Sequence, residues 1–399
     1  MGSVLARLRV PLLMLLVDEA TGLPIGDPDD PIVDPAFAAQ PPQTIANAVQ
    51  QAVDTMILSA SGWRAVFAAD GDEQSTIPEV CPPLLVVAGV AARCFAALFE
   101  PTGRRPPRVA VALDSRPTGP LVARAAIRIL LDAGVEVSYP FVCASPEAMA
   151  YAAAASGLDG FLYVSASHNP VGHNGLKMGG SDGGVLGGDA AASLIDAFDE
   201  LIGDSGELAA IATLLARPAR TEERAVLEGV PAAKRCALDT YAAFCSRVIA
   251  GEGPRAAHAL EILRSGIAAG RPGVVGDLNG SARTATIDHD YLSAAGCRLH
   301  LINARPGQIA HQIVPEGAGL APCRDELERL ASADDGWVLG YVPDNDGDRG
   351  NLVYYDRRGR RARQLEAQEV FALSTVAELA WLVSPASSPT TQRDARPVA

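Results

Sequence analysis

One short acidic stretch of this chain carries residue types suited to metal chemistry. The stretch DNDGDR, residues 344–349, follows the apolar run WVLGYV and places three carboxylates at alternate positions. Alternation in an extended loop brings three oxygen ligands toward one point, which suits a hard cation such as Mg²⁺. An EF-hand loop would need Gly at its sixth position and Glu at its twelfth, where this chain has Arg349 and Tyr355. We therefore expect a Mg²⁺ site rather than a metal-free acidic turn, with the ligands Asp344, Asp346 and Asp348.

A second stretch, FLYVSASHNPVGHNGLKMGG at residues 161–180, begins as an apolar run and continues as a polar loop. This pattern predicts a buried strand that delivers a loop at its C-terminal end, where open α/β sheets place their ligands. Ser167 is the candidate to carry a phosphate that shares the metal, against the alternative of an ordinary turn hydroxyl. A lone histidine such as His168 is more often a hydrogen-bonded structural residue than a catalytic base. Lys177 stands out because Lys234 is the only other lysine in the chain.

The elements that must position these loops follow an alternating order. Strands are expected at residues 108–114, 135–141 and 161–164, with helices of about ten to sixteen residues around them. A similar series follows later, with strands starting near residues 273, 297, 337 and 351. Such alternation predicts an α/β protein with two consecutive α/β/α sandwich domains, mixed but mostly parallel sheets, and the truncated start of a third domain.

The domain limits follow from composition. We expect an N-terminal extension at residues 1–54, domain I at 55–219, domain II at 225–365, the start of domain III at 366–383 and a disordered tail at 384–399. The apolar run at 10–17 predicts a docking helix, residues 22–44 an irregular connector, and the charged residues 220–224 a linker. An apolar face near 370–382 would lack cover, which predicts poor solubility or a partner.

Composition excludes some partners. The net charge of −14 argues against nucleic acid or an anionic membrane as the main partner, because both need a basic face. The seven cysteines are scattered and form no CxxC pair, which indicates reduced thiols and a cytoplasmic protein. Apolar runs stay short of the roughly 20 residues of a membrane span.

Four motifs together resemble one family, the α-D-phosphohexomutases, over about residues 55–380. SASHNPVGHNGLK is similar to their serine motif, TASHNP followed by NGxK, and PDNDGDRG is similar to their DGDGDR metal loop. SASGWR at 59–64 resembles the TSGxRG turn, and DSRPTG at 114–119 resembles the D-x-R-x-S/T segment. The four occur in the order of the family.

The resemblance implies a Mg²⁺-dependent isomerase that passes a phosphoryl group between Ser167 and a phosphosugar, through a hexose 1,6-bisphosphate that also serves as activator. Ser167 would be the phosphorylated serine and would share the metal with the three aspartates of residues 344–348. Arg349 and Arg64 would brace the phosphoryl group, His168 would orient the site, and Lys177 would assist proton transfer or charge neutralisation. These roles agree with phosphoryl transfer as positioning plus electrostatics.

The sequence departs from the family pattern in places. Ser165 replaces the first threonine of the serine motif and Asn345 replaces a glycine of the metal loop, and neither change removes a ligand. The sugar-recognition loop GExSGH and the phosphate-binding loop RxSGT are absent from these 399 residues. We therefore expect an enzyme that is incomplete as a single chain and whose sugar the sequence does not identify. The alternatives are a truncated non-catalytic fragment, half of a split mutase with a separate chain carrying the missing C-terminal domains, and a metal-dependent phosphatase.

Overall fold

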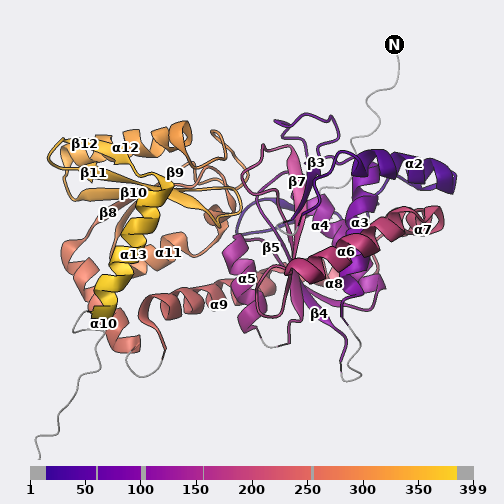
Figure 1. Ribbon diagram of the computed structural model, residues 1–399, viewed down its shortest axis with the longest axis horizontal. Helices are drawn as coiled ribbons and strands as arrows, with labels where there is room; N and C mark the ends of the chain where they lie inside the picture. The colour runs from indigo at the N-terminus through magenta and orange to yellow at the C-terminus, as the bar shows by residue number, and fades with distance from the viewer. Residues whose placement is uncertain (1–14, 60–61, 100–104, 156, 253–255, 384–399) are drawn as a thin grey trace, which may run out of the picture.

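The structure, a computed structural model, describes residues 15–59, 62–99, 105–155, 157–252 and 256–383. It consists of two α/β units side by side, with the long helix α9 (Val230–Ala250) running between them (Figure 1). Each unit holds a five-stranded mixed sheet in which three strands are parallel. The α/β architecture expected from the alternating pattern is confirmed.

The first sheet has the strand order β3-β7-β6-β4-β5. Strands β4, β5 and β6 are parallel, while β7 pairs antiparallel with both β6 and β3. The strand bounds are β3 (Trp63–Val66), β4 (Arg108–Leu113), β5 (Glu136–Val142), β6 (Gly160–Val164) and β7 (His173–Gly180).

Helices cover both faces of this sheet. One face carries a large apolar core built from α3, α4 and the helices packed on them, and the other face packs against α5 and α9. α3 is buried along almost its whole length, as its run of aliphatic residues requires. The helix bounds in this unit are α3 (Pro82–Ala96), α4 (Gly119–Asp132), α5 (Ser145–Ala154), α6 (Gly188–Ile202), α7 (Ser205–Leu215) and α8 (Thr221–Glu228).

The second sheet has the order β12-β11-β10-β8-β9, again with three parallel strands and an antiparallel edge. α12 packs across one face and buries Leu327 and Cys323 against Val342. The elements are α10 (Ala256–Gly270), β8 (Gly273–Asp277), η1 (Ala282–Ala285), α11 (Asp288–Ala295), β9 (Arg298–Ile302), η2 (Gly317–Leu320), α12 (Ala321–Ala333), β10 (Trp337–Pro343), β11 (Gly350–Asp356), β12 (Arg361–Gln364) and α13 (Ala367–Val383).

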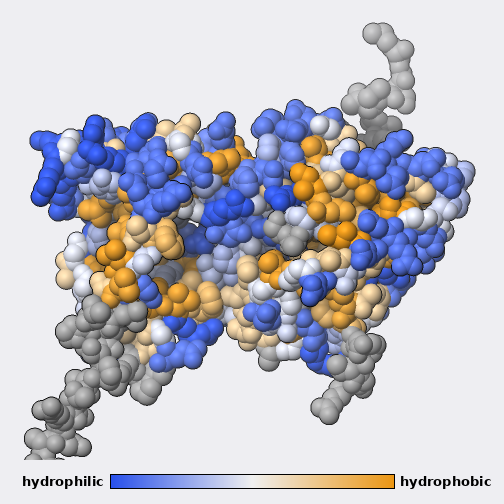
Figure 2. All heavy atoms as spheres, in the orientation of Figure 1, coloured by the Kyte–Doolittle hydropathy of each residue, from blue (hydrophilic) through white to orange (hydrophobic). Residues whose placement is uncertain are grey.

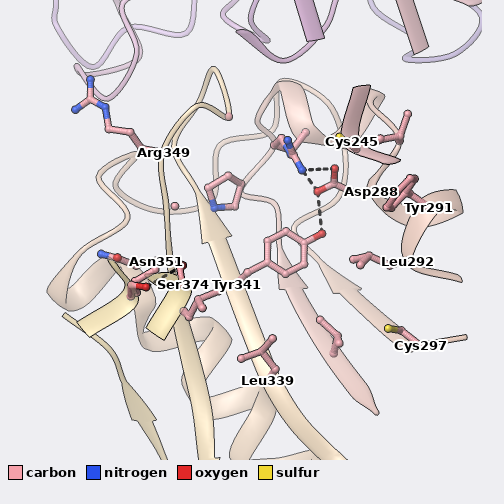
Figure 3. Close-up of a pocket in the computed structure, with 18 of the residues that line it drawn as sticks. Cys245, Asp288, Tyr291, Leu292, Cys297, Leu339, Tyr341, Arg349, Asn351 and Ser374 are labelled. Atoms are coloured by element: carbon pink, nitrogen blue, oxygen red, sulfur yellow. Dashed lines mark hydrogen bonds and ion pairs between the residues drawn. The ribbon is translucent and has the colours of Figure 1, made fainter. Parts of the chain in front are cut away.

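The other face of the second sheet is covered less completely. A mostly apolar cavity of about 670 Å³ lies between the sheet and the helices α9, α10, α11 and α13 (Figure 3). At one end Asp288 pairs with Arg283 at 2.6 Å and accepts a hydrogen bond from the hydroxyl of Tyr341 at 3.0 Å. The cavity reaches the metal loop, since Asp348 and Arg349 also line it.

The N-terminal residues pack on the first unit. β1 (Leu16–Val17) and β2 (Pro24–Gly26) form a small antiparallel hairpin, followed by α1 (Pro35–Ala38) and α2 (Pro42–Val53). Ile45 and Val49 on α2 join the large core. The helix predicted at 10–17 is wrong for residues 15–17, because Leu15 lies in no helix and residues 16–17 form β1. Residues 10–14 lie outside the described residues.

Three other interpretations of the sequence are corrected. Residues 22–44, expected to be an irregular connector, contain β2, α1 and the start of α2. Residues 173–180, expected to be part of a loop, form the strand β7. The charged stretch 220–224, expected to be a linker, lies largely in α8, where the buried Glu223 binds Arg128 on α4 at 2.7 Å. The tail expected at 384–399 lies outside the described residues. Within the described part of the chain, none of the helices combines the length and apolarity needed to cross a bilayer.

Candidate active site

Ser167 lies on the loop that leaves the C-terminal end of β6, at the junction of the two units. Its hydroxyl donates a hydrogen bond to Oδ2 of Asp344 at 2.9 Å and accepts one from Nη2 of Arg349 at 3.0 Å. Both partners belong to the second unit, and the serine is only 2% exposed. Its backbone is left-handed, with φ of 53°. Non-glycine residues rarely adopt this conformation, so the surrounding contacts must hold it.

Arg116 supplies many of these contacts. It is almost fully buried, pairs with Asp114 at 3.1 Å, and donates to backbone oxygens of the serine loop. The acceptors include the carbonyls of Ser167 at 2.8 Å and His173 at 3.1 Å, and its other loop acceptors are Asn169 and Pro170. One guanidinium therefore shapes the whole loop. The D-x-R segment is the sequence signal for Arg116, but the segment alone does not predict which groups this side chain binds.

Ser165 connects the serine loop to its support. Its hydroxyl donates to Oδ2 of Asp114 at 2.7 Å and accepts from the backbone N–H of Ser167 at 2.8 Å. Burial raises the pKa of Asp114, although the nearby Arg116 opposes this shift. Because a hydroxyl is all that these contacts use, serine can stand where the family motif has threonine.

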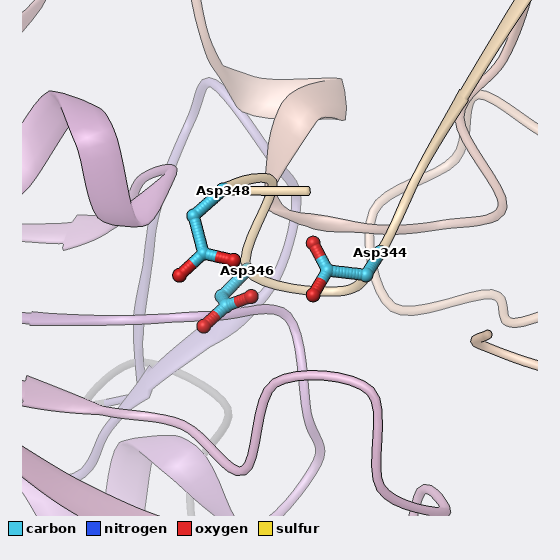
Figure 4. A group of neighbouring side chains, drawn as sticks. All are labelled: Asp344, Asp346 and Asp348. Atoms are coloured by element: carbon cyan, nitrogen blue, oxygen red, sulfur yellow. The ribbon is translucent and has the colours of Figure 1, made fainter. Parts of the chain in front are cut away.

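The metal loop follows β10 and brings three carboxylates together. Asp344, Asp346 and Asp348 each offer an oxygen within 4.8 Å of the others, and their side chains face one another in Figure 4. Asp344 and Asp346 are fully buried, and among the residues that the structure describes Oδ1 of Asp346 has no hydrogen-bond partner. Such an arrangement of hard oxygen donors, one of them unsatisfied, fits a divalent cation such as Mg²⁺.

Lys177 lies on β7 and meets the same carboxylates. Its Nζ is 2.5 Å from Asp346 and 3.1 Å from Asp348. Burial disfavours the charged lysine, but the two carboxylates outweigh it and the pKa of Lys177 is raised. Burial likewise opposes ionisation of Asp346, yet Lys177 lowers the pKa of this carboxyl. Burial, followed by the charges of Asp346 and Asp348, raises the pKa of Asp344 to about 8.

His168 and Arg64 are both partly exposed. Burial, then the positive charges of Arg349 and Arg64, lower the pKa of His168, so its imidazole is neutral at pH 7. Arg64 is on β3, where it pairs with Gly175 of β7. All the residues expected from the two loops and from the SASGWR segment are thus gathered at one place, apart from residues 60–61, which lie outside the described chain.

Backbone contacts fix the metal loop against both units. The amide of Ser145 donates to the carbonyl of Asp346 at 2.7 Å, and the amide of Ala282 donates to the carbonyl of Asn345 at 2.9 Å. The hydroxyl of Ser115 also donates to Oδ1 of Asn345 at 3.0 Å. No local sequence pattern predicts these contacts, because their partners are far apart in the chain.

The fold and this site define a class of proteins. A family model described as phosphoglucomutase/phosphomannomutase, alpha/beta/alpha domain I, matches residues 85–202. This match supports the resemblance of the chain to the α-D-phosphohexomutase superfamily.

Two relatives similar to the chain in sequence are phosphoglucosamine mutases. The phosphoglucosamine mutase of Kineococcus radiotolerans is 30% identical over 292 residues, which cover 72% of this chain and 55% of that protein. The phosphoglucosamine mutase of Lacticaseibacillus casei is 35% identical over 137 residues, or 34% of this chain and 30% of that protein. The chain thus spans about half the length of the first of these relatives and less of the second.

A solved structure shares the fold. A phosphoglucomutase/phosphomannomutase family protein from Burkholderia thailandensis matches with a TM-score of 0.50 at 19% identity, over 81% of this chain and 60% of that one. At this identity the likeness shows the arrangement of the elements.

Proposed function

We propose that this chain carries out phosphohexomutase-type phosphoryl transfer, with Ser167 as the residue that is phosphorylated. The observation that carries the proposal is the position of its hydroxyl between Asp344 and Arg349, two residues of the opposite unit. A serine placed only by turn geometry would not need an acidic loop and a guanidinium from another sheet. The acidic loop and the guanidinium are the parts that phosphoryl transfer requires.

In the proposed reaction the oxygen of Ser167 attacks a phosphorus of a hexose bisphosphate. The new serine O–P bond forms as the O–P bond to the sugar breaks, and the serine proton ends on the released sugar oxygen. The reverse reaction returns the phosphoryl group to a sugar hydroxyl. Arg349 and Arg64 would stabilise the negative charge of the moving group, and the neutral His168 would orient it.

The metal site is part of the same proposal. Asp344, Asp346 and Asp348 would hold Mg²⁺, together with the phosphate of Ser167 once it has formed. When bound, the ion would neutralise charge on the phosphoryl oxygens. Lys177 would balance the charge of Asp346 and Asp348, which it already contacts.

The substrate class comes from the relatives. Because they are named phosphoglucosamine mutases, we propose a hexosamine or hexose phosphate as substrate and the corresponding 1,6-bisphosphate as activator. A cytoplasmic location also belongs to this proposal, supported by seven cysteines that are all free thiols.

The test is phosphorylation of Ser167. The protein is incubated with Mg²⁺ and either glucose or glucosamine 1,6-bisphosphate, and peptides are mapped by mass spectrometry. We expect one phosphoryl group on Ser167, none in S167A, and normal labelling in S181A, which changes an exposed turn serine of the same unit. An unmodified Ser167 in folded protein with Mg²⁺ would overturn the proposal. Release of inorganic phosphate without a new sugar isomer would favour a phosphatase instead.

A further inference from the structure

Lys234, the second lysine of the chain, lies outside the four motifs and is buried close to the segment that contacts the metal loop. Lys234 lies on α9 and is 4% exposed. Its Nζ donates to the carbonyl of Val142 at 2.6 Å and to Oε1 of Glu147 at 3.1 Å. Val142 ends β5 and Glu147 lies in the first turn of α5. One ammonium group therefore ties together both sides of the turn between strand and helix.

This turn is the surface on which the metal loop rests. The amide of Ser145, within the turn, donates to the carbonyl of Asp346 at 2.7 Å. A Cβ placed on Gly347 would lie 3.3 Å from the Cβ of Ala144, so the two backbones are closely packed. Asp346 is thus fixed through its own main chain to the segment that Lys234 holds.

The C-terminal end of β5 departs from regular strand geometry. Phe141 is fully buried with a left-handed φ of 60°, and the pairing of β4 with β5 shifts register between Ala110 and Ala112. Such a conformation is unfavourable for a residue with a side chain and persists only where neighbours fix it. The neighbours here include the hydroxyl of Tyr163, which donates to the carbonyl of Cys143 at 2.7 Å.

The chemistry of the pair also argues for a role beyond stability. The carboxylate of Glu147 is fully buried, and its Oε2 has no hydrogen-bond partner in the described part of the chain. Buried ion pairs contribute little net stability compared with apolar residues of similar size, because desolvation opposes their attraction. A compact ammonium can reach a carbonyl and a carboxylate in this space, whereas a guanidinium is larger and planar.

We propose that Lys234 and Glu147 are positioning residues that hold the backbone of Asp346, and with it the metal loop, against the loop of Ser167. This inference rests on the proposed function, because it assumes that the three aspartates bind a divalent cation. Groups that orient metal ligands from behind typically alter metal affinity by about 10–100-fold when they are removed.

The experiment measures Mn²⁺ binding, as a stand-in for Mg²⁺, by electron paramagnetic resonance at a temperature where every variant is folded. We expect K234M and E147Q to weaken Mn²⁺ binding by about 10–100-fold relative to the wild type. The double variant E147L/K234M removes both charges and should recover thermal stability while its Mn²⁺ binding stays weak. This combination would separate positioning from folding.

A matched control comes from another buried pair in the first unit. Arg128 and Glu223 are paired at 2.7 Å between α4 and α8, and neither is hydrogen-bonded to residues 344–349 in the structure described here. E223Q should lower stability and keep wild-type Mn²⁺ affinity. If the wild type binds Mn²⁺ and the Lys234 and Glu147 variants bind it equally well, the positioning role is overturned. A wild type that binds no Mn²⁺ would overturn the metal site itself, and this inference with it.

Discussion

At the scale of single residues, Ser167 has a left-handed backbone conformation, and its hydroxyl forms hydrogen bonds with two side chains. Its left-handed φ turns the side chain away from the course of β6 and toward the second unit, where Asp344 and Arg349 meet it. The sequence identified both loops from their residue types. It could not show that Arg116 donates hydrogen bonds to the carbonyls of the serine loop.

Arg349 should matter for transfer and little for folding. Its side chain is 54% exposed, so R349A should change the free energy of unfolding by less than about 1 kcal/mol. Removal of one donor to a developing charge typically slows a reaction by about 10²–10³-fold. We expect that loss in the rate of Ser167 phosphorylation, measured by quenched-flow mass spectrometry. R358A, at an exposed arginine of the β11–β12 turn, should react as the wild type does. Equal rates for R349A and wild type would contradict the role.

Asp344 should give metal binding a clear pH dependence. With its pKa raised to about 8, this carboxyl is mostly protonated at pH 7 in the metal-free protein. Since a cation needs the ionised carboxylate, Mg²⁺ binding at pH 7 should release about one proton from Asp344. This proton release should disappear well above pH 8. Calorimetry in buffers of different ionisation enthalpy measures this number. A binding enthalpy independent of the buffer would refute the prediction.

The same shift affects stability without metal. A folded-state pKa above the usual 3.8 means that the folded protein keeps a proton that the unfolded chain has lost. The stabilising contribution of Asp344 is therefore complete below about pH 4 and is lost as the pH rises through about 8. D344N should remove this slope from urea unfolding measured with a chelator present.

At the scale of elements, β7 explains why one prediction was wrong. Its glycines look like loop residues, but they reflect close packing between strands. A Cβ on Gly175 would lie 2.1 Å from the carbonyl oxygen of Trp63, and one on Gly179 would lie 2.1 Å from the ring of Phe161. The strand in turn carries Lys177 to the carboxylates, so the glycines are needed to bring this lysine into the site.

The helix α8 was missed for another reason. A run of alternating charges in a sequence is usually a solvated surface or linker. Here Glu223 is buried because Arg128, 95 residues earlier, reaches it from α4. Local pattern cannot reveal a pairing over that separation. In contrast, β4 and β6 were predicted closely, because their apolar runs are local.

The serine loop depends on a guanidinium, which gives a sharp prediction for R116K. A lysine keeps the charge but cannot donate to Asp114 and to several carbonyls in different directions at once. Breaking a buried pair of this kind typically costs about 3–5 kcal/mol. We expect a loss of that order in urea unfolding, and little phosphorylation of Ser167 at temperatures where the variant is folded. Full labelling of R116K would show that the loop does not need Arg116.

At the scale of the whole molecule, the site exists only where the two units meet. The first unit supplies Ser167 and Lys177, and the second supplies the aspartates and Arg349. The sequence predicted this combination through its motifs, whereas the contacts that set the two units in place, such as Ser145 with Asp346, became visible only in three dimensions. The domain limits expected from composition remain predictions.

The helix α13 should make the protein prone to self-association. Phe371 is 74% exposed and Val376 is 62% exposed, in a helix made mostly of apolar residues. Hydrophobic side chains gather over this helix and its neighbours in Figure 2. The double variant F371S/V376S should bind less of an apolar fluorescent dye and sediment as a smaller species, with an unchanged melting temperature. The matched surface change E378Q should leave both measurements as in the wild type. An unaltered dye signal in F371S/V376S would show that α13 is not the surface through which the protein self-associates.

The scarcity of lysine has a practical consequence. Both lysine side chains are mostly covered, with 13% of Lys177 and 5% of Lys234 exposed. An amine-reactive acylating reagent can therefore modify these side chains quickly only when the metal loop lifts or α9 separates from β5. The rate of acylation of Lys177 would therefore measure how often the metal loop lifts. The rate at Lys234 would measure how often α9 separates from β5. Because nearly all the other basic residues are arginines, acylation of these two lysine side chains would report on the contact between the two units.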